Sequence, residues 1–236
     1  MILRISPGRP PLGRRLAAEA VGTGLLALAV IGSGLQAAVL SRDTGVQLLA
    51  NTMASVCALG VLIALLAPVS GAHFNPLVTA GFWWTGRRAP GALAGPEACG
   101  YALAQLAGGF AGSLLAGVMF GHTGAAGTAR TGTAVWTGEL VATAVLLLVV
   151  LGLGRTGQQR YAPVAVAGWI TAGIWCTASG SFANPALTAA RAVNDGFTGI
   201  APASLPGYLL AQLAGAVLGL ALLALLFPAP EEAEAV

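Results

Sequence analysis

Two asparagine–proline pairs, Asn75-Pro76 and Asn184-Pro185, carry the most informative chemistry in this chain. Each pair opens a short apolar stretch, and a proline that follows an asparagine cap is a strong signal for the first turn of a helix. A helix N-terminus carries about half a positive charge, and the asparagine amide adds hydrogen-bond donors beside it. One such pair is usually an ordinary helix cap. Two pairs that faced each other would repel a cation and orient the oxygen of a neutral solute.

The chain that carries these pairs has the composition of a membrane protein. Of its 236 residues, 56% are hydrophobic and 8% are charged, whereas soluble domains are about 25% charged. A membrane span needs about 20 mainly apolar residues, and six stretches qualify: 16–40, 47–69, 98–120, 134–153, 162–179 and 205–227. The stretches that begin with the Asn-Pro pairs, 75–85 and 184–194, are too short to cross, so we expect them to enter the membrane and return.

The two halves of the chain repeat each other. Three matches relate them: Glu19–Thr23 with Glu139–Thr143, Phe74–Ala80 with Ala183–Ala189, and Tyr101–Gly108 with Tyr208–Gly215. Because each half has three spans, the halves must run in opposite senses across the membrane, and such inverted repeats place their broken helices together near the midplane. The sequence therefore predicts an all-α membrane fold with six transmembrane helices and two re-entrant half-helices in an inverted 3+3 repeat.

The arginines give the orientation, because the chain has no lysine. With the N-terminus inside, eight arginines fall in cytoplasmic segments and three in outer ones, which agrees with the positive-inside rule. We expect a cytoplasmic segment at 1–14, one channel domain at 15–227 with repeats at about 15–120 and 133–227, and a cytoplasmic tail at 228–236. The expected location is the cell (plasma) membrane.

Two carboxylates, Glu19 and Glu139, lie inside the predicted spans. An acid inside a membrane is by default a functional group, for example in a proton relay, but one copy at the same place in each half favours structural support. A proton-coupled secondary transporter of a small solute, which can also be built from inverted repeats, is the alternative to a passive channel. The sequence has no catalytic carboxylate pair, nucleophile motif or metal-ligand spacing, and no basic cluster suited to nucleic acid. We therefore expect neither an enzyme nor a metal or other cofactor.

The segment Ser70–Thr79, with the sequence Ser-Gly-Ala-His-Phe-Asn-Pro-Leu-Val-Thr, resembles the first signature loop of the major intrinsic protein family (aquaporins and aquaglyceroporins). Phe182–Ala186 is similar to the second signature loop, and the match in layout covers about 15–227. The resemblance implies a right-handed bundle in lipid, a homotetramer, and one pore per subunit for water and small neutral solutes. It also implies that Glu19 and Glu139 support the signature loops, that His73 lines the cytoplasmic vestibule, and that six residues form the pore signature: Asn75, Pro76, Leu77, Asn184, Pro185 and Ala186.

The chain departs from the family pattern in both loops. Leu77 stands where the family usually has alanine, so it should narrow or dry the midplane slightly. Leu187 stands where most members place the arginine of the narrow outer filter. The next arginine, Arg191, comes one helical turn later and either supplies the displaced filter charge, which is the reading we prefer, or reaches the outer headgroups beside Asp195. Counting without gaps puts the remaining filter positions at three small residues: Ser55, Ala172 and Ser181.

A filter of this composition is wide and short of fixed charge, unless Trp169 or Trp175 enters the pore. We therefore expect the pore to admit glycerol, urea or neutral trihydroxy acids such as arsenite and antimonite. The second loop resembles that of bacterial members found with arsenic-resistance genes, and the alternative is a general facilitator with no dedicated substrate.

Overall fold

The computed structural model describes residues 9–87, 92–122 and 127–227, and within these ranges every regular element is a helix. Five helices are long and apolar enough to cross a membrane. They are α1 (Leu12–Leu40), α2 (Thr44–Ser70), α4 (Gly95–Phe120), α5 (Thr133–Arg155) and α8 (Leu205–Leu226). Most of the predicted N-terminal segment 1–14 and the whole predicted tail 228–236 lie outside the described residues.

The predicted span 162–179 is shorter in the structure than expected. Its helix α6 (Ala162–Cys176) has 15 residues and follows a single 3₁₀ turn, Gln159–Tyr161. At about 1.5 Å per residue such a helix covers roughly 22 Å, which is less than the hydrocarbon core of about 30 Å. The helix ends early because Thr177 is extended and the chain turns there into the second signature loop.

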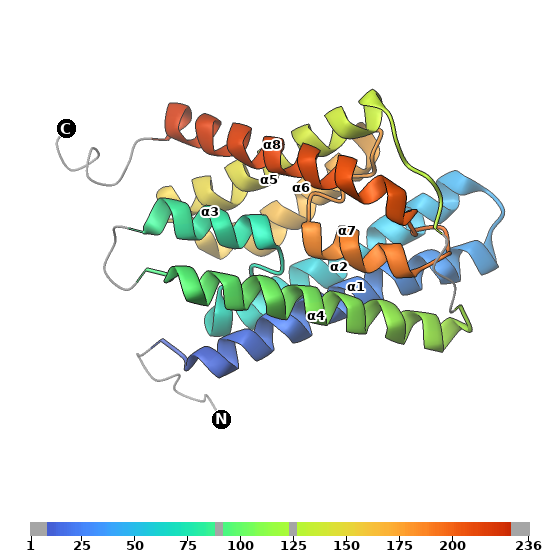
Figure 1. The fold of residues 1–236 in the computed structure, drawn as a ribbon, viewed down its shortest axis with the longest axis horizontal. Coiled ribbons are helices and arrows are strands. Elements are labelled where there is room, and N and C mark those ends of the chain that lie inside the picture. Colours follow the sequence, from blue (N-terminus) through green and yellow to red (C-terminus); the bar gives the residue numbers. More distant parts are fainter. Residues whose placement is uncertain (1–8, 88–91, 123–126, 228–236) are drawn as a thin grey trace.

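The two short stretches fold as half-helices, as predicted. The first is α3 (Pro76–Gly86), and the second is α7 (Pro185–Ala190), which continues as a 3₁₀ turn to Val193. Figure 1 shows both in the interior of the bundle, between the long helices that surround them. The start of α1 and the end of α8 lie at the same end of the bundle, as an even number of crossings requires.

Each half of the chain is held together by a matching pair of helices. In the first half α1 packs mainly on α4, and in the second α5 packs mainly on α8. A Cβ atom on Gly108 would collide with the carbonyl oxygen of Ala20, and one on Gly215 would collide with that of Leu140. Because these glycines occupy matching positions of the repeat, the same close backbone approach, typical of membrane helices, occurs in both halves.

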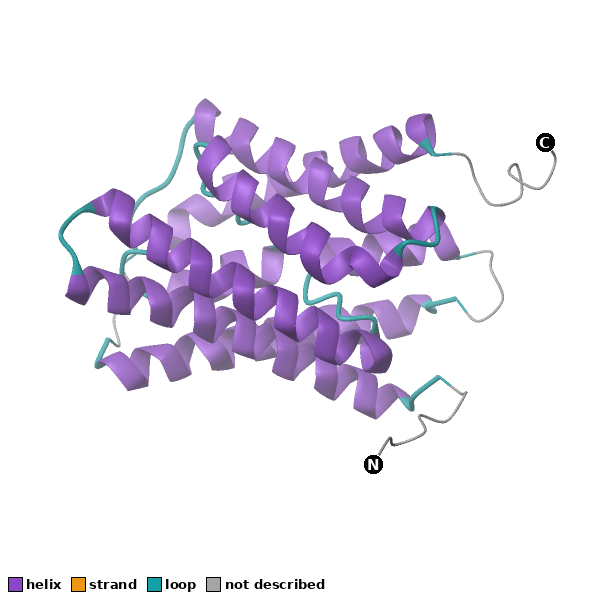
Figure 2. Cartoon of the chain, turned by 180° about the vertical axis from the view of Figure 1, so that it is seen from behind, coloured by secondary structure: helices purple, strands orange, loops and turns teal. Residues whose placement is uncertain are grey.

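The outer surface of the bundle is suited to lipid. Large apolar side chains such as Val39, Val118, Val164 and Leu225 are mostly exposed on it. Seen from behind, the described chain is a bundle of helices joined by short loops (Figure 2). A helix satisfies most of its backbone polar groups within itself, which is what a bilayer requires of spanning segments.

Candidate functional site

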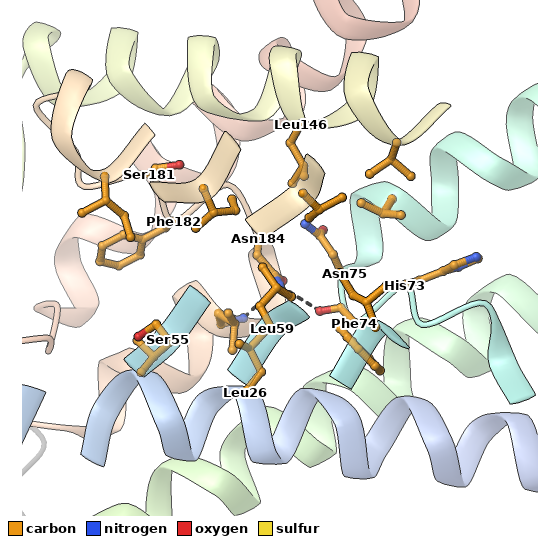
Figure 3. Close-up of a pocket in the computed structure, with 18 of the residues that line it drawn as sticks. Leu26, Ser55, Leu59, His73, Phe74, Asn75, Leu146, Ser181, Phe182 and Asn184 are labelled. Carbon is orange, nitrogen blue, oxygen red and sulfur yellow. Dashed lines mark hydrogen bonds between the residues drawn. The ribbon is translucent and has the colours of Figure 1, made fainter. Parts of the chain in front are cut away.

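The N-termini of α3 and α7 meet at the centre of the molecule (Figure 3). Asn75 Nδ2 donates to the carbonyl oxygen of Ala183 at 2.7 Å, and Asn184 Nδ2 donates to that of Phe74 at 2.8 Å. Each asparagine also caps its own half-helix, since Asn75 Oδ1 accepts from Leu77 N and Asn184 Oδ1 accepts from backbone N–H groups of α7. An amide nitrogen has two N–H groups, so each asparagine keeps one for the cavity beside it.

The loops that carry the asparagines have an unusual backbone. Ala72 and Phe74 in the first loop and Ser181 and Ala183 in the second all have φ between 47° and 52°. Non-glycine residues reach this left-handed region at a cost of about 1–3 kcal/mol each. The neighbouring structure must offset this cost if the half-helices are to keep their positions.

Glu19 is hydrogen-bonded to the backbone of the first loop. It is fully buried, and its two carboxylate oxygens accept hydrogen bonds from His73 N at 3.0 Å and from Phe74 N at 2.7 Å. The same oxygens accept from Ser70 Oγ at 2.6 Å and from Gln105 Nε2 at 2.7 Å. Charge-assisted bonds of this kind are about twice as strong as neutral ones, so they offset much of the backbone strain.

Glu139 does the same in the second loop. It is also fully buried, and it accepts from Phe182 N at 2.8 Å, from Ala183 N at 2.8 Å and from Gln212 Nε2 at 2.6 Å. These contacts are the ones that a supporting acid requires. Neither Glu19 nor Glu139 is among the residues that line the cavity, so a proton relay through them has no contact with a passing solute.

Two glutamines that the sequence analysis did not single out complete these networks. Gln105 Nε2 also donates to Thr79 Oγ1 at 2.9 Å, and Gln212 Nε2 to Thr188 Oγ1 at 2.8 Å. Each glutamine therefore ties a supporting glutamate to a half-helix. The signal was present in the sequence, because both glutamines occupy the same position of the repeated segments Tyr101–Gly108 and Tyr208–Gly215.

A cavity of about 400 Å³ passes both half-helix N-termini. Helices α1, α2, α5 and α6 supply most of its wall, which is largely apolar: Leu26, Val30, Leu59, Ile63, Leu146, Val150, Val166, Ile170 and Ile174. Polar groups come mainly from the signature loops and their surroundings. In Figure 3, Ser55, Ser181 and Phe182 lie on one side of the paired asparagines and His73 lies on the other.

His73 is fixed on its side of the cavity by a stack and a hydrogen bond. Its ring is parallel to that of Phe82, with 4.6 Å between centroids, and its Nδ1 lies 3.1 Å from Thr79 Oγ1. Thr79 Oγ1 donates its single proton to the carbonyl oxygen of Asn75, so it can only accept in its contact with His73. We therefore place the imidazole proton of His73 on Nδ1. The Nε2 lone pair then remains as an acceptor. His73 lines the cavity.

Most of the predicted filter residues lie together, but Ala172 does not. Ser55, Ser181, Leu187 and Arg191 all line the cavity. Ala172 is exposed on another face of α6, whose cavity-lining positions are Ala162, Val166, Ile170 and Ile174. The prediction for Ala172 is therefore wrong. Counting back from Asn184 without gaps missed the cavity-lining face of α6 by two residues.

Leu77 also lies elsewhere than we expected. Its side chain is buried in the main apolar cluster and does not line the cavity, so it does not narrow the midplane. Pro76, Pro185 and Ala186 form the first turns of the half-helices and are likewise absent from the lining. Of the six pore-signature residues, the two asparagines contact the cavity directly.

The two tryptophans left open by the sequence do not enter the cavity. Trp169 Nε1 donates to the carbonyl oxygen of Ala142 at 3.0 Å, and its ring packs against the main apolar cluster. Trp175 is exposed on α6. The small filter side chains are therefore not compensated by either indole ring.

Arg191 faces the cavity rather than Asp195. Its guanidinium carbon lies 3.4 Å from the centre of the Phe182 ring, and its Nε donates to the carbonyl oxygen of Thr198 at 2.6 Å. Asp195 is 3.3 Å from His122 Nδ1 instead. A second arginine, Arg130, lines the same cavity. No local sequence signal indicates this, because Arg130 comes from the loop before α5 and reaches the cavity only through tertiary folding.

The chain is similar to known channel proteins over most of its length. The family model described as "Major intrinsic protein" matches residues 9–167. The aquaglyceroporin AqpS of Rhizobium meliloti (strain 1021) is 45% identical over 214 residues, which cover 90% of this chain and 89% of that protein. Aquaporin Z of Photorhabdus laumondii subsp. laumondii is 29% identical over 170 residues, which cover 65% of this chain and 71% of that protein.

A solved structure shows the same fold. The aquaglyceroporin from Plasmodium falciparum aligns with a TM-score of 0.65 at 22% identity, covering 89% of this chain and 93% of that one. Together these similarities confirm the resemblance found in the signature loops and the predicted all-α membrane fold.

Proposed function

The chain belongs to the major intrinsic protein family, and from this premise we propose that its pore carries small polyhydroxy solutes as well as water. Membership makes the chain a passive membrane channel for small neutral solutes and not an enzyme. The finer questions are which solutes pass, what excludes ions, and how the protein is placed and assembled in the membrane.

The observation that carries the proposal for polyhydroxy solutes is the composition of the filter. Leu187 lines the cavity at the position where most family members have an arginine. Ser55 and Ser181, which have small hydroxyl-bearing side chains, also line it. An apolar wall with a few hydroxyl groups suits a solute that presents hydroxyls on one side and carbon on the other. Glycerol has this chemistry, and the similarity to an aquaglyceroporin supports it.

Neutral trihydroxy acids such as arsenite and antimonite share the size and hydroxyl pattern of glycerol. We include them among the solutes that the pore admits, because nothing in the lining selects for carbon. The donors that face the cavity, such as the amides of Asn75 and Asn184, can bond to the hydroxyl oxygens of either kind of solute.

The paired half-helices are the proposed barrier to protons and ions. Two helix N-termini, each with about half a positive charge, point at the same part of the cavity, and Asn75 and Asn184 offer only donors there. A cation would be repelled by both ends. A hydronium relay would be interrupted because a water that accepts from both amides cannot also accept from the next water.

The distribution of arginines in the sequence supports an orientation of the chain in the membrane. We propose a homotetramer in the plasma membrane, surrounded by lipid, with both chain ends in the cytoplasm and one pore in each subunit. The even number of crossings and the arginine distribution support the orientation. A coupled transporter is disfavoured because Glu19 and Glu139 accept hydrogen bonds within the loops and do not line the cavity.

Stopped-flow light scattering on proteoliposomes tests the proposed solutes. Vesicles with the protein should shrink faster than empty vesicles when an impermeant osmolyte is added outside, which measures water flux. They should also re-swell faster when the added solute is glycerol or arsenite, which measures solute entry. A large water flux with no glycerol flux above that of empty vesicles would refute the polyhydroxy substrate class. Solute accumulation driven by a proton gradient would refute passive transport.

A further inference from the structure

One end of the cavity carries two arginines, Arg130 and Arg191, which we call the two-arginine rim. This end is formed by the segments 127–132 and 191–200 and is the end that we place outside the cell. Both side chains line the cavity. Both also lie near the Phe182 ring, whose centre is 3.4 Å from the guanidinium carbon of Arg191 and 5.9 Å from that of Arg130. The two guanidinium carbons are therefore no farther apart than the sum of these distances.

Three consecutive carbonyl groups fix the two guanidinium groups. The carbonyl oxygen of Thr198 accepts from Arg191 Nε at 2.6 Å, while those of Phe197 and Gly199 on either side accept from Arg130 Nη2 at 2.9 Å and Arg130 Nε at 3.3 Å. An arginine has five N–H donors. Within the described chain, Arg130 Nη1 and both Nη atoms of Arg191 have no hydrogen-bond partner, so the rim has spare donors in fixed positions.

No carboxylate forms an ion pair with either arginine in the described parts of the chain. The acids at the same end of the bundle, Asp43 and Asp195, are engaged elsewhere. Asp43 caps α2 by accepting from Val46 N at 2.9 Å, and Asp195 lies 3.3 Å from His122 Nδ1. Glu139 lies near Arg191, but its carboxylate accepts its hydrogen bonds from the second signature loop and Gln212. The rim is therefore a pair of preorganised cations without an ion-pair partner among the described residues.

Two buried hydroxyl groups lie beside the rim without partners. Thr198 is 1% exposed and Ser181 is 5% exposed, and both line the cavity. Neither Thr198 Oγ1 nor Ser181 Oγ has a hydrogen-bond partner within the described residues. Buried polar groups are rarely left unpaired in proteins, but both hydroxyl oxygens are covered by neighbouring atoms, so the guanidinium N–H groups are the donors that this end of the cavity offers to a ligand.

We propose that the two-arginine rim binds a small oxyanion such as phosphate at the outer mouth of the pore, where the anion slows the entry of neutral solutes. Guanidinium groups bind oxyanions through strong paired hydrogen bonds. Farther in, Leu187 and Leu146 line the cavity and the donors are the uncharged amides of Asn75 and Asn184 at the half-helix N-termini, so the charged guanidinium groups of the rim are the stronger partners for an oxyanion. The slowing of flux rests on the proposed function, whereas the binding itself does not.

Two readouts test the oxyanion site. The first is the melting temperature of the purified protein in inorganic phosphate, compared with chloride at the same ionic strength. The second is glycerol flux into proteoliposomes with phosphate on the outer side. We expect phosphate to raise the melting temperature and to slow glycerol entry. Arg130→Gln should raise the phosphate concentration needed for each effect at least about tenfold, because that is the loss of affinity expected for one hydrogen bond to a charged group.

Two further variants separate the rim from a general charge effect. Arg42→Gln removes an outer arginine that does not line the cavity, so it should leave both phosphate effects unchanged. Arg130→Lys keeps the charge and should keep only part of the affinity for phosphate. If Arg130→Gln does not fold, this partial loss in Arg130→Lys becomes the test of the site.

Three results would overturn the proposal. They are the absence of any phosphate effect on the wild-type melting temperature, an equal effect in wild type and Arg130→Gln, and an equal loss of affinity in Arg42→Gln. If glycerol does not enter wild-type vesicles, the proposed function fails, and the melting measurements still decide whether the oxyanion site exists.

Discussion

Replacing Glu139 by glutamine tests whether a buried, ionised carboxylate holds the second signature loop. The carboxylate accepts from Phe182 N, Ala183 N and Gln212 Nε2. A carboxamide has one acceptor oxygen and one NH₂ group that only donates. In its better orientation the NH₂ group faces Phe182 N, so Phe182 N loses its partner and the NH₂ group adds at least one further buried donor without a partner. At about 1–3 kcal/mol for each donor, Glu139→Gln should destabilise the fold by about 2–6 kcal/mol.

That loss is a large part of the total stability of a typical domain, about 5–15 kcal/mol. Glu139→Gln should therefore melt well below the wild type in detergent, and glycerol flux per reconstituted protein should fall because the loop that carries Asn184 is released. Thr137→Val, an exposed change on the same helix, is the matched control and should melt as the wild type does. A Glu139→Gln protein with wild-type melting and flux would refute the supporting role.

Three further changes test the filter, the register of α6 and the close helix contacts. Leu187→Arg restores the charge that most family members have at the filter, so it should cut glycerol flux more than water flux in stopped-flow assays, and an equal loss of both would contradict the filter assignment. Ile174→Trp should block glycerol flux because Ile174 lines the cavity, whereas Ala172→Trp should leave it unchanged; the reverse result would restore the predicted register. Gly215→Ala should reduce the melting temperature because the new methyl group meets a backbone carbonyl. Gly168→Ala has open space around it and should be neutral or stabilising by up to about 1 kcal/mol. Equal melting of the two variants would contradict the close contact.

The sequence was sufficient to predict the fold and the pairing of the asparagines. Both follow from signals that are local or repeated: long apolar stretches, two Asn-Pro pairs and a duplicated order of elements. The duplication also predicted that Glu19 and Glu139 would have equivalent roles, and the structure gives them equivalent hydrogen bonds. Repetition is informative here because the same tertiary contact is encoded twice.

The sequence was insufficient where side-chain direction depends on helix ends and loops. Ala172 was misplaced because a register counted across the loop 177–184 carries any irregularity of that loop into α6. Leu77 was expected at the midplane, but the rotation of α3 directs it into the apolar cluster. Arg130 was missed because it reaches the cavity through contacts with the carbonyls of Phe197 and Gly199, which lie in a loop with no repeated counterpart.

The most direct test of the central claim is to measure proton flux and glycerol flux in the same proteoliposomes, with a pH-sensitive dye inside and the membrane potential clamped by potassium and valinomycin. If the half-helices abut at Asn75 and Asn184 and repel positive charge, glycerol should enter faster than into empty vesicles while the proton flux equals that of empty vesicles. Proton flux that rises together with glycerol flux as more protein is reconstituted would contradict the account.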